Sequence, residues 1–96
     1  LPVGIKYNQQ QVELIGIYPN PAADYIRFQY FMKEADALKV EVYNLQGKMV
    51  ESLDYGIRTR GLNEDALSVS KLPNAEYIVV FRTGNQVTSR KFVKQQ

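Results

Sequence analysis

The chain has 96 residues, and its 12 basic and 10 acidic side chains leave a formal net charge of +2. Hydrophobic residues make up 45% and charged residues 23%, which is typical of one small globular domain and not of a disordered chain. The absence of His, Cys and Trp excludes disulfide bonds, the usual zinc sites and catalytic groups built on imidazole or thiolate. No apolar run approaches the roughly 20 residues of a membrane helix, so we expect a chain that is not membrane-inserted. Because His, Cys and Trp are absent, we also expect that the chain is not an enzyme and holds no cofactor.

The pattern along the chain predicts an all-β fold. Residues 1–11 end in a polar run and predict a linker, and residues 12–96 predict the folded domain. Short alternating segments separated by turn residues favour an immunoglobulin-like β-sandwich of about seven antiparallel strands. The expected strands are Val12–Tyr18, Tyr25–Phe31, Leu38–Tyr43, Lys48–Leu53, Ala66–Ser70, Glu76–Arg82 and Val87–Lys94. A break at residues 54–56 and a further short strand over Ile57–Leu62 complete the prediction.

Turn residues indicate how these strands connect. Pro19-Asn20-Pro21 ends the first strand, because neither proline can donate a ladder hydrogen bond. Asp24 has a short side chain that can bond nearby backbone amides and hold that turn. Gly47 can take positive φ without steric cost, which predicts a hairpin between the third and fourth strands. The strand expected over Glu76–Arg82 has a centre, residues 77–81, that is apolar on both faces and predicts a central position in a sheet.

Carboxylates are the only candidates for catalysis or metal binding. The pairs Glu34/Asp36 and Glu64/Asp65 could exchange protons with a substrate. Both pairs lie in polar stretches without a predicted cleft, so solvated loop charges are the other interpretation. Asn63 adds a third oxygen ligand beside Glu64 and Asp65, so a calcium site is a further alternative. The spacing of the three residues matches no known loop motif.

Basic residues are concentrated at the end of the chain. The last 20 residues contain Arg82, Arg90, Lys91 and Lys94 and no acidic residue. These cations either protect a solvated edge strand from unwanted pairing or attract an acidic partner. Four charges rarely hold a nucleic acid alone, so we expect no nucleic-acid partner.

Aromatic residues allow a second function. The seven tyrosines could form a sugar-binding platform, for example from Tyr7, Tyr25, Tyr43 or Tyr55. The chain would then be an immunoglobulin-like or fibronectin-like accessory module that binds carbohydrate or protein. Tyrosines at strand spacing can equally lie half-buried with the hydroxyl at the surface.

Three stretches in order resemble one known family. The chain contains Tyr-Pro-Asn-Pro-Ala-Ala-Asp-Tyr-Ile at residues 18–26, Val-Glu-Val-Tyr-Asn-Leu-Gln-Gly-Lys-Met-Val at residues 40–50 and Lys-Phe-Val-Lys-Gln at residues 91–95. Together they resemble the C-terminal sorting domain of proteins exported by the bacterial type IX secretion system. The resemblance covers about residues 15–96. It departs at Ala75, where the family usually has glycine; positive φ there would strain alanine by roughly 1–2 kcal/mol, unless Asn74 takes the left-handed position.

The resemblance implies a secretion signal of a Gram-negative bacterium. An upstream cargo domain would enter the periplasm by its own signal peptide, cross the outer membrane through the secretion translocon and reach the cell surface or the medium. A sortase-like protease would then remove the sorting domain. The implied partners are the translocon, shuttle and sortase proteins, and the cargo.

The terminal strand is the expected recognition element. A receptor could add a strand to its edge, with Lys91 and Lys94 facing an acidic surface and Phe92 and Val93 as anchors. Alternatively, Phe92 is a core residue and Lys91 a solvated charge. An unpaired edge would also allow a homodimer. The expected recognition residues are Lys91, Phe92, Val93, Lys94, Gln95 and Lys48. The expected structural residues are Pro19, Asn20, Pro21, Asp24 and Gly47.

Overall fold

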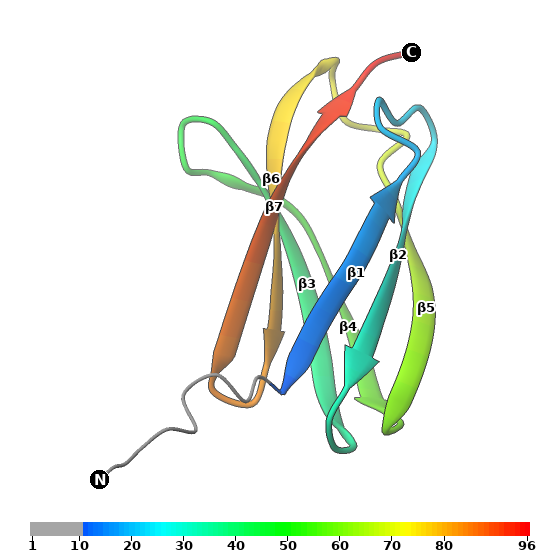
Figure 1. Ribbon diagram of the computed structural model, residues 1–96. Coiled ribbons are helices and arrows are strands. Elements are labelled where there is room, and N and C mark those ends of the chain that lie inside the picture. Colours follow the sequence, from blue (N-terminus) through cyan, green and yellow to red (C-terminus); the bar gives the residue numbers. More distant parts are fainter. Residues whose placement is uncertain (1–10) are drawn as a thin grey trace, which may run out of the picture.

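The chain forms seven strands and no helix over the residues that the computed structural model describes, 11–96 (Figure 1). The strands are β1 (Val12–Tyr18), β2 (Tyr25–Met32), β3 (Asp36–Asn44), β4 (Met49–Arg58), β5 (Gly61–Ser68), β6 (Ala75–Thr83) and β7 (Gln86–Lys94). The predicted linker lies outside the described residues except for Gln11, whose carbonyl accepts a hydrogen bond from Lys33 N at 2.7 Å.

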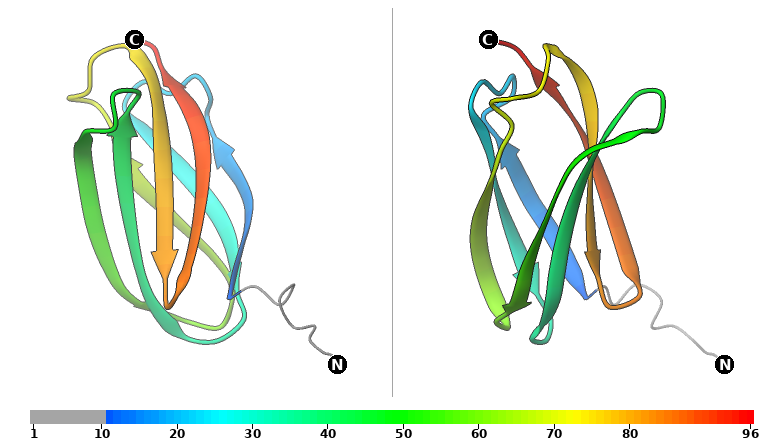
Figure 2. Two further views of the ribbon diagram at one scale, coloured as in Figure 1. Left: turned by 90° about the vertical axis from the view of Figure 1, so that its left-hand side faces the viewer. Right: turned by 180° about the vertical axis from the view of Figure 1, so that it is seen from behind.

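The strands make a two-layer sandwich. One sheet has the order β1-β2-β5 and the other β4-β3-β6-β7, and every strand pair is antiparallel. Figures 1 and 2 show the two sheets facing each other, with β1 and β7 along one side and β4 and β5 along the other. The expected all-β sandwich of seven antiparallel strands is confirmed.

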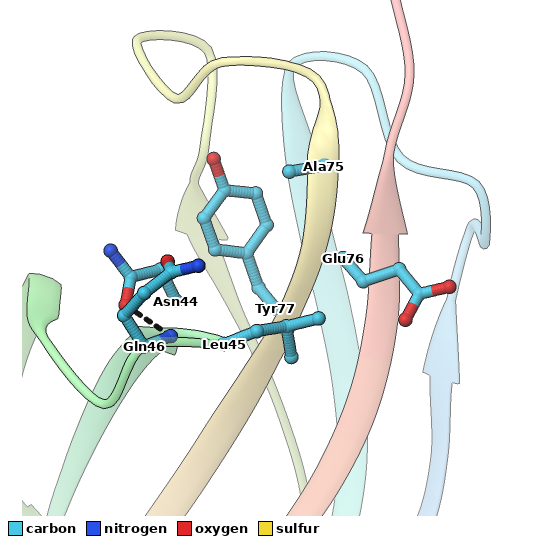
Figure 3. Close-up of a pocket in the computed structure, with 6 residues that line it drawn as sticks. All are labelled: Asn44, Leu45, Gln46, Ala75, Glu76 and Tyr77. Atoms are coloured by element: carbon cyan, nitrogen blue, oxygen red, sulfur yellow. Dashed lines mark hydrogen bonds between the residues drawn. The ribbon is translucent and has the colours of Figure 1, made fainter.

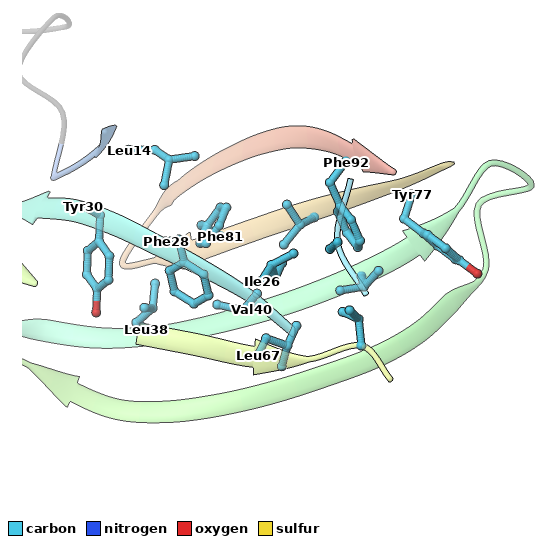
Figure 4. Close-up of a cluster of buried hydrophobic side chains, with 14 of the residues drawn as sticks. Leu14, Ile26, Phe28, Tyr30, Leu38, Val40, Leu67, Tyr77, Phe81 and Phe92 are labelled. Carbon is cyan, nitrogen blue, oxygen red and sulfur yellow. The ribbon is translucent and has the colours of Figure 1, made fainter. Parts of the chain in front are cut away.

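The core lies between the inner faces of the two sheets (Figure 4). Ile26 and Phe28 of β2 and Val40 of β3 have no exposed surface, because alternate residues of each strand face the other sheet. The ring of Phe28 meets that of Phe81 edge-on, with centroids 4.9 Å apart. β6 lies between β3 and β7, which confirms the central position predicted from its apolar run.

The predicted break at residues 54–56 and the short strand over Ile57–Leu62 are wrong. β4 continues through Tyr55 and Gly56 to Arg58, and β5 begins at Gly61. A shift in the pairing register opposite Leu38 and Lys39 accommodates the extra residue, and Gly56 takes a φ of 72° there. A bulge of this kind bends a strand without ending it, so a glycine that resembled a break lies within β4.

Gln86 ties the beginning of β1 to the β6–β7 hairpin. Its side-chain amide accepts a hydrogen bond from Val12 N at 3.0 Å and donates one to Val12 O at 2.9 Å. In all views this point lies at the end of the sandwich opposite the C-terminus (Figures 1 and 2). The two ends of the described chain are therefore held at opposite ends of the domain.

Candidate functional site

Parts of three sequence stretches that lie far apart in the chain are found at one end of the sandwich, where the β3–β4 turn projects away from the other two (Figure 1). The loop over residues 19–24, the β3–β4 turn and residues 94–96 all lie at the end that carries the C-terminus, together with the β5–β6 loop (Figures 1 and 2). We call this end the clamp end. The β-sandwich topology brings these segments together, since each connects or terminates strands that run to the same end.

The first stretch holds the tail by backbone hydrogen bonds. Ala22 N donates to Val93 O at 2.7 Å, and Gln95 N donates to Ala22 O at 2.8 Å, which makes a short parallel bridge. Asn20 Oδ1 accepts from Val93 N at 3.0 Å. We call these four residues, Asn20, Ala22, Val93 and Gln95, the tail clamp. The sequence predicted Asn20 as structural but missed Ala22, because its contribution comes from its backbone.

The prolines and Asp24 shape this loop. The peptide bonds before Pro19 and Pro21 are both cis. Asp24 contributes its backbone carbonyl, which accepts a hydrogen bond from Val69 N at 2.9 Å. The loop is thereby joined both to the tail and to the β5–β6 loop.

Lys94 is buried, and the expectation that it faces an acidic receptor is wrong for the folded domain. Only 1% of its surface is exposed. Its Nζ donates to Leu72 O at 2.8 Å and to Gln96 Oε1 at 3.2 Å. Asn74 Oδ1 completes this second attachment by accepting from Gln96 N at 3.2 Å. The aliphatic stem covers apolar surface while the ammonium reaches a backbone carbonyl.

Phe92 occupies a core position, which was the alternative interpretation of that residue. It is fully buried and stacks on Tyr77, with ring centroids 5.6 Å apart. Val93 is half-buried, whereas Lys91 and Gln95 are exposed. Lys91 Nζ lies 3.5 Å from Glu76 Oε1 in a pair that is open to solvent. Side chains of β7 alternate between the two faces of the sheet. Of the four neighbouring recognition candidates, Phe92 and Lys94 therefore lie on the core face, and Lys91 and Val93 lie on the outer face.

No described non-glycine residue has positive φ. The strain considered for Ala75, and the left-handed alternative for Asn74, are therefore both absent. Ala75 begins β6 and pairs with Lys94 in extended conformation.

Asn44 organises the β3–β4 turn. Its Oδ1 accepts hydrogen bonds from Gln46 N and Lys48 N, both at 2.9 Å. Gly47 takes a φ of 87°, as the turn prediction requires, and Lys48 is exposed. The sequence analysis missed the role of Asn44, although an Asn that bonds the amide two residues ahead is a recognisable turn signal.

A shallow pocket of about 290 Å³ lies between this turn and the start of β6 (Figure 3). It is lined by Asn44, Leu45, Gln46, Ala75, Glu76 and Tyr77. Glu76 supplies the only carboxylate, and Tyr77 OH donates to Pro73 O at 2.6 Å.

The carboxylates considered for calcium do not converge. Glu64 lies on the outer face of β5, where its carboxylate accepts a hydrogen bond from Tyr18 OH. Asp65 faces inward, where Oδ2 accepts from Tyr30 OH at 2.5 Å and lies 3.2 Å from Arg58 Nε. Consecutive residues of a strand point to opposite faces, which separates these ligands. Within residues 11–96, no three acidic residues are grouped as a metal site would require.

The inward-facing Asp65 belongs to a buried structural cluster. Burial raises the pKa of Tyr30 far above its ordinary value, and the hydrogen bond to Asp65 acts in the same direction. Tyr55 OH donates to Ala66 O at 2.6 Å, and burial raises its pKa as well. Both phenols stay protonated, so this cluster stabilises the packing of β4 and β5 rather than providing a nucleophile.

Over the described residues, no helix has the length and apolarity needed to cross a membrane.

Comparison with known proteins gives a match to a protein family. The profile of the family described as "Secretion system C-terminal sorting domain" matches residues 16–95, which includes all three stretches at the clamp end. No curated protein and no solved structure matches the chain. A match over most of the chain establishes the family, whose members act as sorting signals for type IX secretion together with an upstream cargo. The chain therefore belongs to the type IX secretion C-terminal sorting domains.

Proposed function

We propose that the secretion machinery binds this domain at the clamp end and that the domain performs no catalysis of its own. The observation that carries the proposal is that parts of the three family stretches lie at one end of the sandwich, where the tail clamp joins the first stretch to the last. Lys48, Lys91 and Gln95 are exposed and would contact a translocon or shuttle protein. Phe92 and Lys94 would act indirectly, since their buried side chains hold the tail in position.

The position of β1 suits an upstream cargo. Val12 begins β1 at the end of the sandwich far from the clamp end (Figure 1). A folded cargo attached there leaves the clamp end accessible to the translocon. After transfer through the periplasm and the outer membrane, a sortase-like protease would cut before β1, because β1 itself is paired with β2 along its length.

The test is the export of a fluorescent reporter fused in front of Leu1 in cells with a working type IX system. A chain that ends at Arg90 is a poor variant, because it also removes the core residue Phe92. Asn20→Ala instead removes one hydrogen bond of the tail clamp, at a cost of about 1 kcal/mol. A second variant ends at Lys94 and removes Gln95 with its bond to Ala22, together with Gln96 and its bonds to Lys94 and Asn74. The matched control is Asn85→Ala, in the exposed β6–β7 turn at the other end of the sandwich.

The expected result is periplasmic retention of the two clamp-end variants and normal export of the Asn85→Ala control. Circular dichroism at the growth temperature must show that all three remain folded. Normal export of both clamp-end variants would refute reading at the clamp end. Export of the reporter without the domain would refute the sorting function itself.

Exposed aromatic side chains on one sheet favour one second function. Tyr18, Tyr25 and Phe31 are 38%, 42% and 44% exposed on the outer face of the three-stranded sheet. Of the tyrosines named from the sequence, Tyr25 belongs to this group, whereas Tyr43 lies half-buried on the other sheet and Tyr55 packs against the core. Tyr7 lies outside the described residues. Binding to a glycan array that is lost in Tyr25→Ala and Phe31→Ala, with export unchanged, would establish an accessory binding function.

A further inference from the structure

We infer that the middle of the β7 edge pairs with an extended acidic segment of a partner protein, which would add a fifth strand to the β4-β3-β6-β7 sheet. The inference rests on the proposed function, because the partner would belong to the machinery that reads the domain. It goes further because it specifies the surface that is contacted and the chemistry of the partner segment. The contacted surface is the stretch of β7 from Val87 to Lys91, which we call the β7 window.

The four edge strands differ in how well they could accept another strand. β1 has a register shift between Leu14 and Gly16, and the β3–β4 pairing has two shifts. β5 turns Asp65 toward the interior. Bulges and inward-pointing charges are the devices by which proteins protect edges from added strands. β7 has no register shift, since its nine residues pair with β6 without interruption. Its one buried charged side chain, Lys94, lies beyond the β7 window.

Existing contacts limit the free edge to the β7 window. Before it, the side chain of Gln86 holds the backbone of Val12. After it, Val93 and Gln95 use their outward backbone groups in the tail clamp. Hydrogen-bonding direction alternates along an antiparallel strand, so Val87, Ser89 and Lys91 also direct their backbone N–H and C=O groups away from β6. Within residues 11–96, β6 is the only ladder partner of β7.

Charge defines the partner segment. Arg90 and Lys91 are exposed, and no acidic residue occurs between Tyr77 and the end of the chain. Glu76 lies 3.5 Å from Lys91 Nζ in a pair open to solvent, which an incoming carboxylate can replace. The two side chains project to opposite faces of β7 because they are consecutive. An added strand with two consecutive acidic residues would place one carboxylate beside each cation. Arg90 Nη1 now donates to Ser89 O at 3.0 Å, a local exposed contact that an incoming N–H group can replace.

The same charges argue against a second copy of this chain as the occupant. Two β7 edges brought together would place the cations of both copies side by side, and like charges across a strand pair are destabilising. The expected state of the isolated domain is therefore a monomer. Sedimentation equilibrium checks this, and a dimer that Ser89→Pro dissociates would overturn the acidic partner in favour of self-pairing.

Proline at position 89 tests the backbone contact. The Ser89 N–H faces away from β6, so Ser89→Pro keeps the β6–β7 ladder and removes a donor that only an added strand would use. Ser89→Thr is the matched control, because it keeps the N–H and suits a strand. The double variant Arg90→Glu/Lys91→Glu tests the charge. If Ser89→Pro does not fold, Val87→Pro at the preceding outward position takes its place.

The readout is reporter export, with folding followed by thermal unfolding. We expect Ser89→Pro and the charge-reversed variant to fold and to lower export by about tenfold, the effect of losing about 1.4 kcal/mol of binding. Ser89→Thr should export normally. Normal export of the folded Ser89→Pro variant would refute strand addition, even if charge reversal lowers export. A loss with proline but not with charge reversal would keep strand addition and refute the acidic segment.

The outcome also separates this inference from the proposed function. If Asn20→Ala lowers export while the β7 window variants do not, binding at the clamp end is supported and strand addition at β7 is refuted. If none of these variants lowers export, both hypotheses are refuted.

Discussion

Lys91 and Lys94 have the same side chain, lie three residues apart on β7 and have opposite surroundings. Lys91 faces solvent and pairs loosely with Glu76, and the Lys94 ammonium is enclosed and donates to Leu72 O. Exposed ion pairs contribute little, because water screens the charges and the side chains lose freedom. A buried donor that satisfies a buried carbonyl contributes more, since the carbonyl would otherwise lose its partner.

Lys94→Ala should therefore lower the free energy of unfolding by about 2 kcal/mol, through lost packing and the unsatisfied carbonyl. Lys91→Ala should change it by less than about 0.5 kcal/mol. Urea denaturation of both variants measures the difference. Equal effects would show that the Lys94 environment contributes no stability.

Glu41 is a second residue whose surroundings change its chemistry. The Arg82 guanidinium donates to Glu41 Oε1 at 2.8 Å and lowers the pKa of that carboxyl, against the opposing effect of burial; Tyr43 OH adds a further hydrogen bond at 2.8 Å. A carboxyl with a lower pKa in the folded state binds its proton less readily than in the unfolded chain. Its contribution to stability is present above the unfolded value of about 4.3 and declines as the pH falls below it.

We expect Glu41→Gln to be less stable than the parent domain at pH 7 by about 1 kcal/mol, a modest value because the Arg82 side chain is 46% exposed. The gap should narrow as the pH is lowered from 5 to 3. Urea denaturation across this pH range provides the measurement. A gap independent of pH would contradict the lowered pKa of Glu41.

At the scale of elements, turns and bulges decide where strands end. The β3–β4 turn needs Gly47 because its φ of 87° lies in the left-handed region, where a β-carbon clashes with the following backbone. Gly16 lies within β1, its φ is ordinary, and an added β-carbon would meet no atom within 4 Å. The two glycines therefore differ in conformation and not in available space.

Gly47→Ala should lower the free energy of unfolding by about 1 kcal/mol through backbone strain. Gly16→Ala should be neutral or slightly stabilising, because alanine reduces the freedom of the unfolded chain. Thermal unfolding compares the two variants. A neutral Gly47→Ala variant would mean that the turn relaxes to another geometry.

At the scale of the whole molecule, the sandwich separates the start of β1 from the clamp end (Figure 2). A folded reporter in front of Leu1 should leave the unfolding temperature of the domain nearly unchanged and should be exported. The same reporter placed after Gln96 should leave the domain folded but lower export, since it covers the tail held by Ala22 and Asn74. Calorimetry and surface fluorescence test both halves. Equal export from the two fusions would contradict recognition at the clamp end.

Local features of this protein were predictable from its sequence alone. Strands and turns could be identified from patterns of residues a few positions apart. These patterns are the alternation of apolar and polar residues in β2 and β3, the apolar run in β6 and the turn at Gly47. The three family stretches likewise indicated the sorting function that the family match supports. The boundary between β4 and β5 was not predictable in this way, since the bulge at Gly56 depends on how β3 pairs with β4.

The tertiary structure decided which candidate residues are accessible. No local pattern shows that Ala22 pairs with the tail from more than 70 positions away, or that Lys94 turns inward to Leu72. The pairing of Ala22 and the hydrogen bond of Lys94 both require that the two sheets come together at the clamp end. Hydrogen bonds between such distant segments form only when the core between the sheets is packed. For the same reason only the folded sandwich distinguishes the regular β7 edge from the three protected edges.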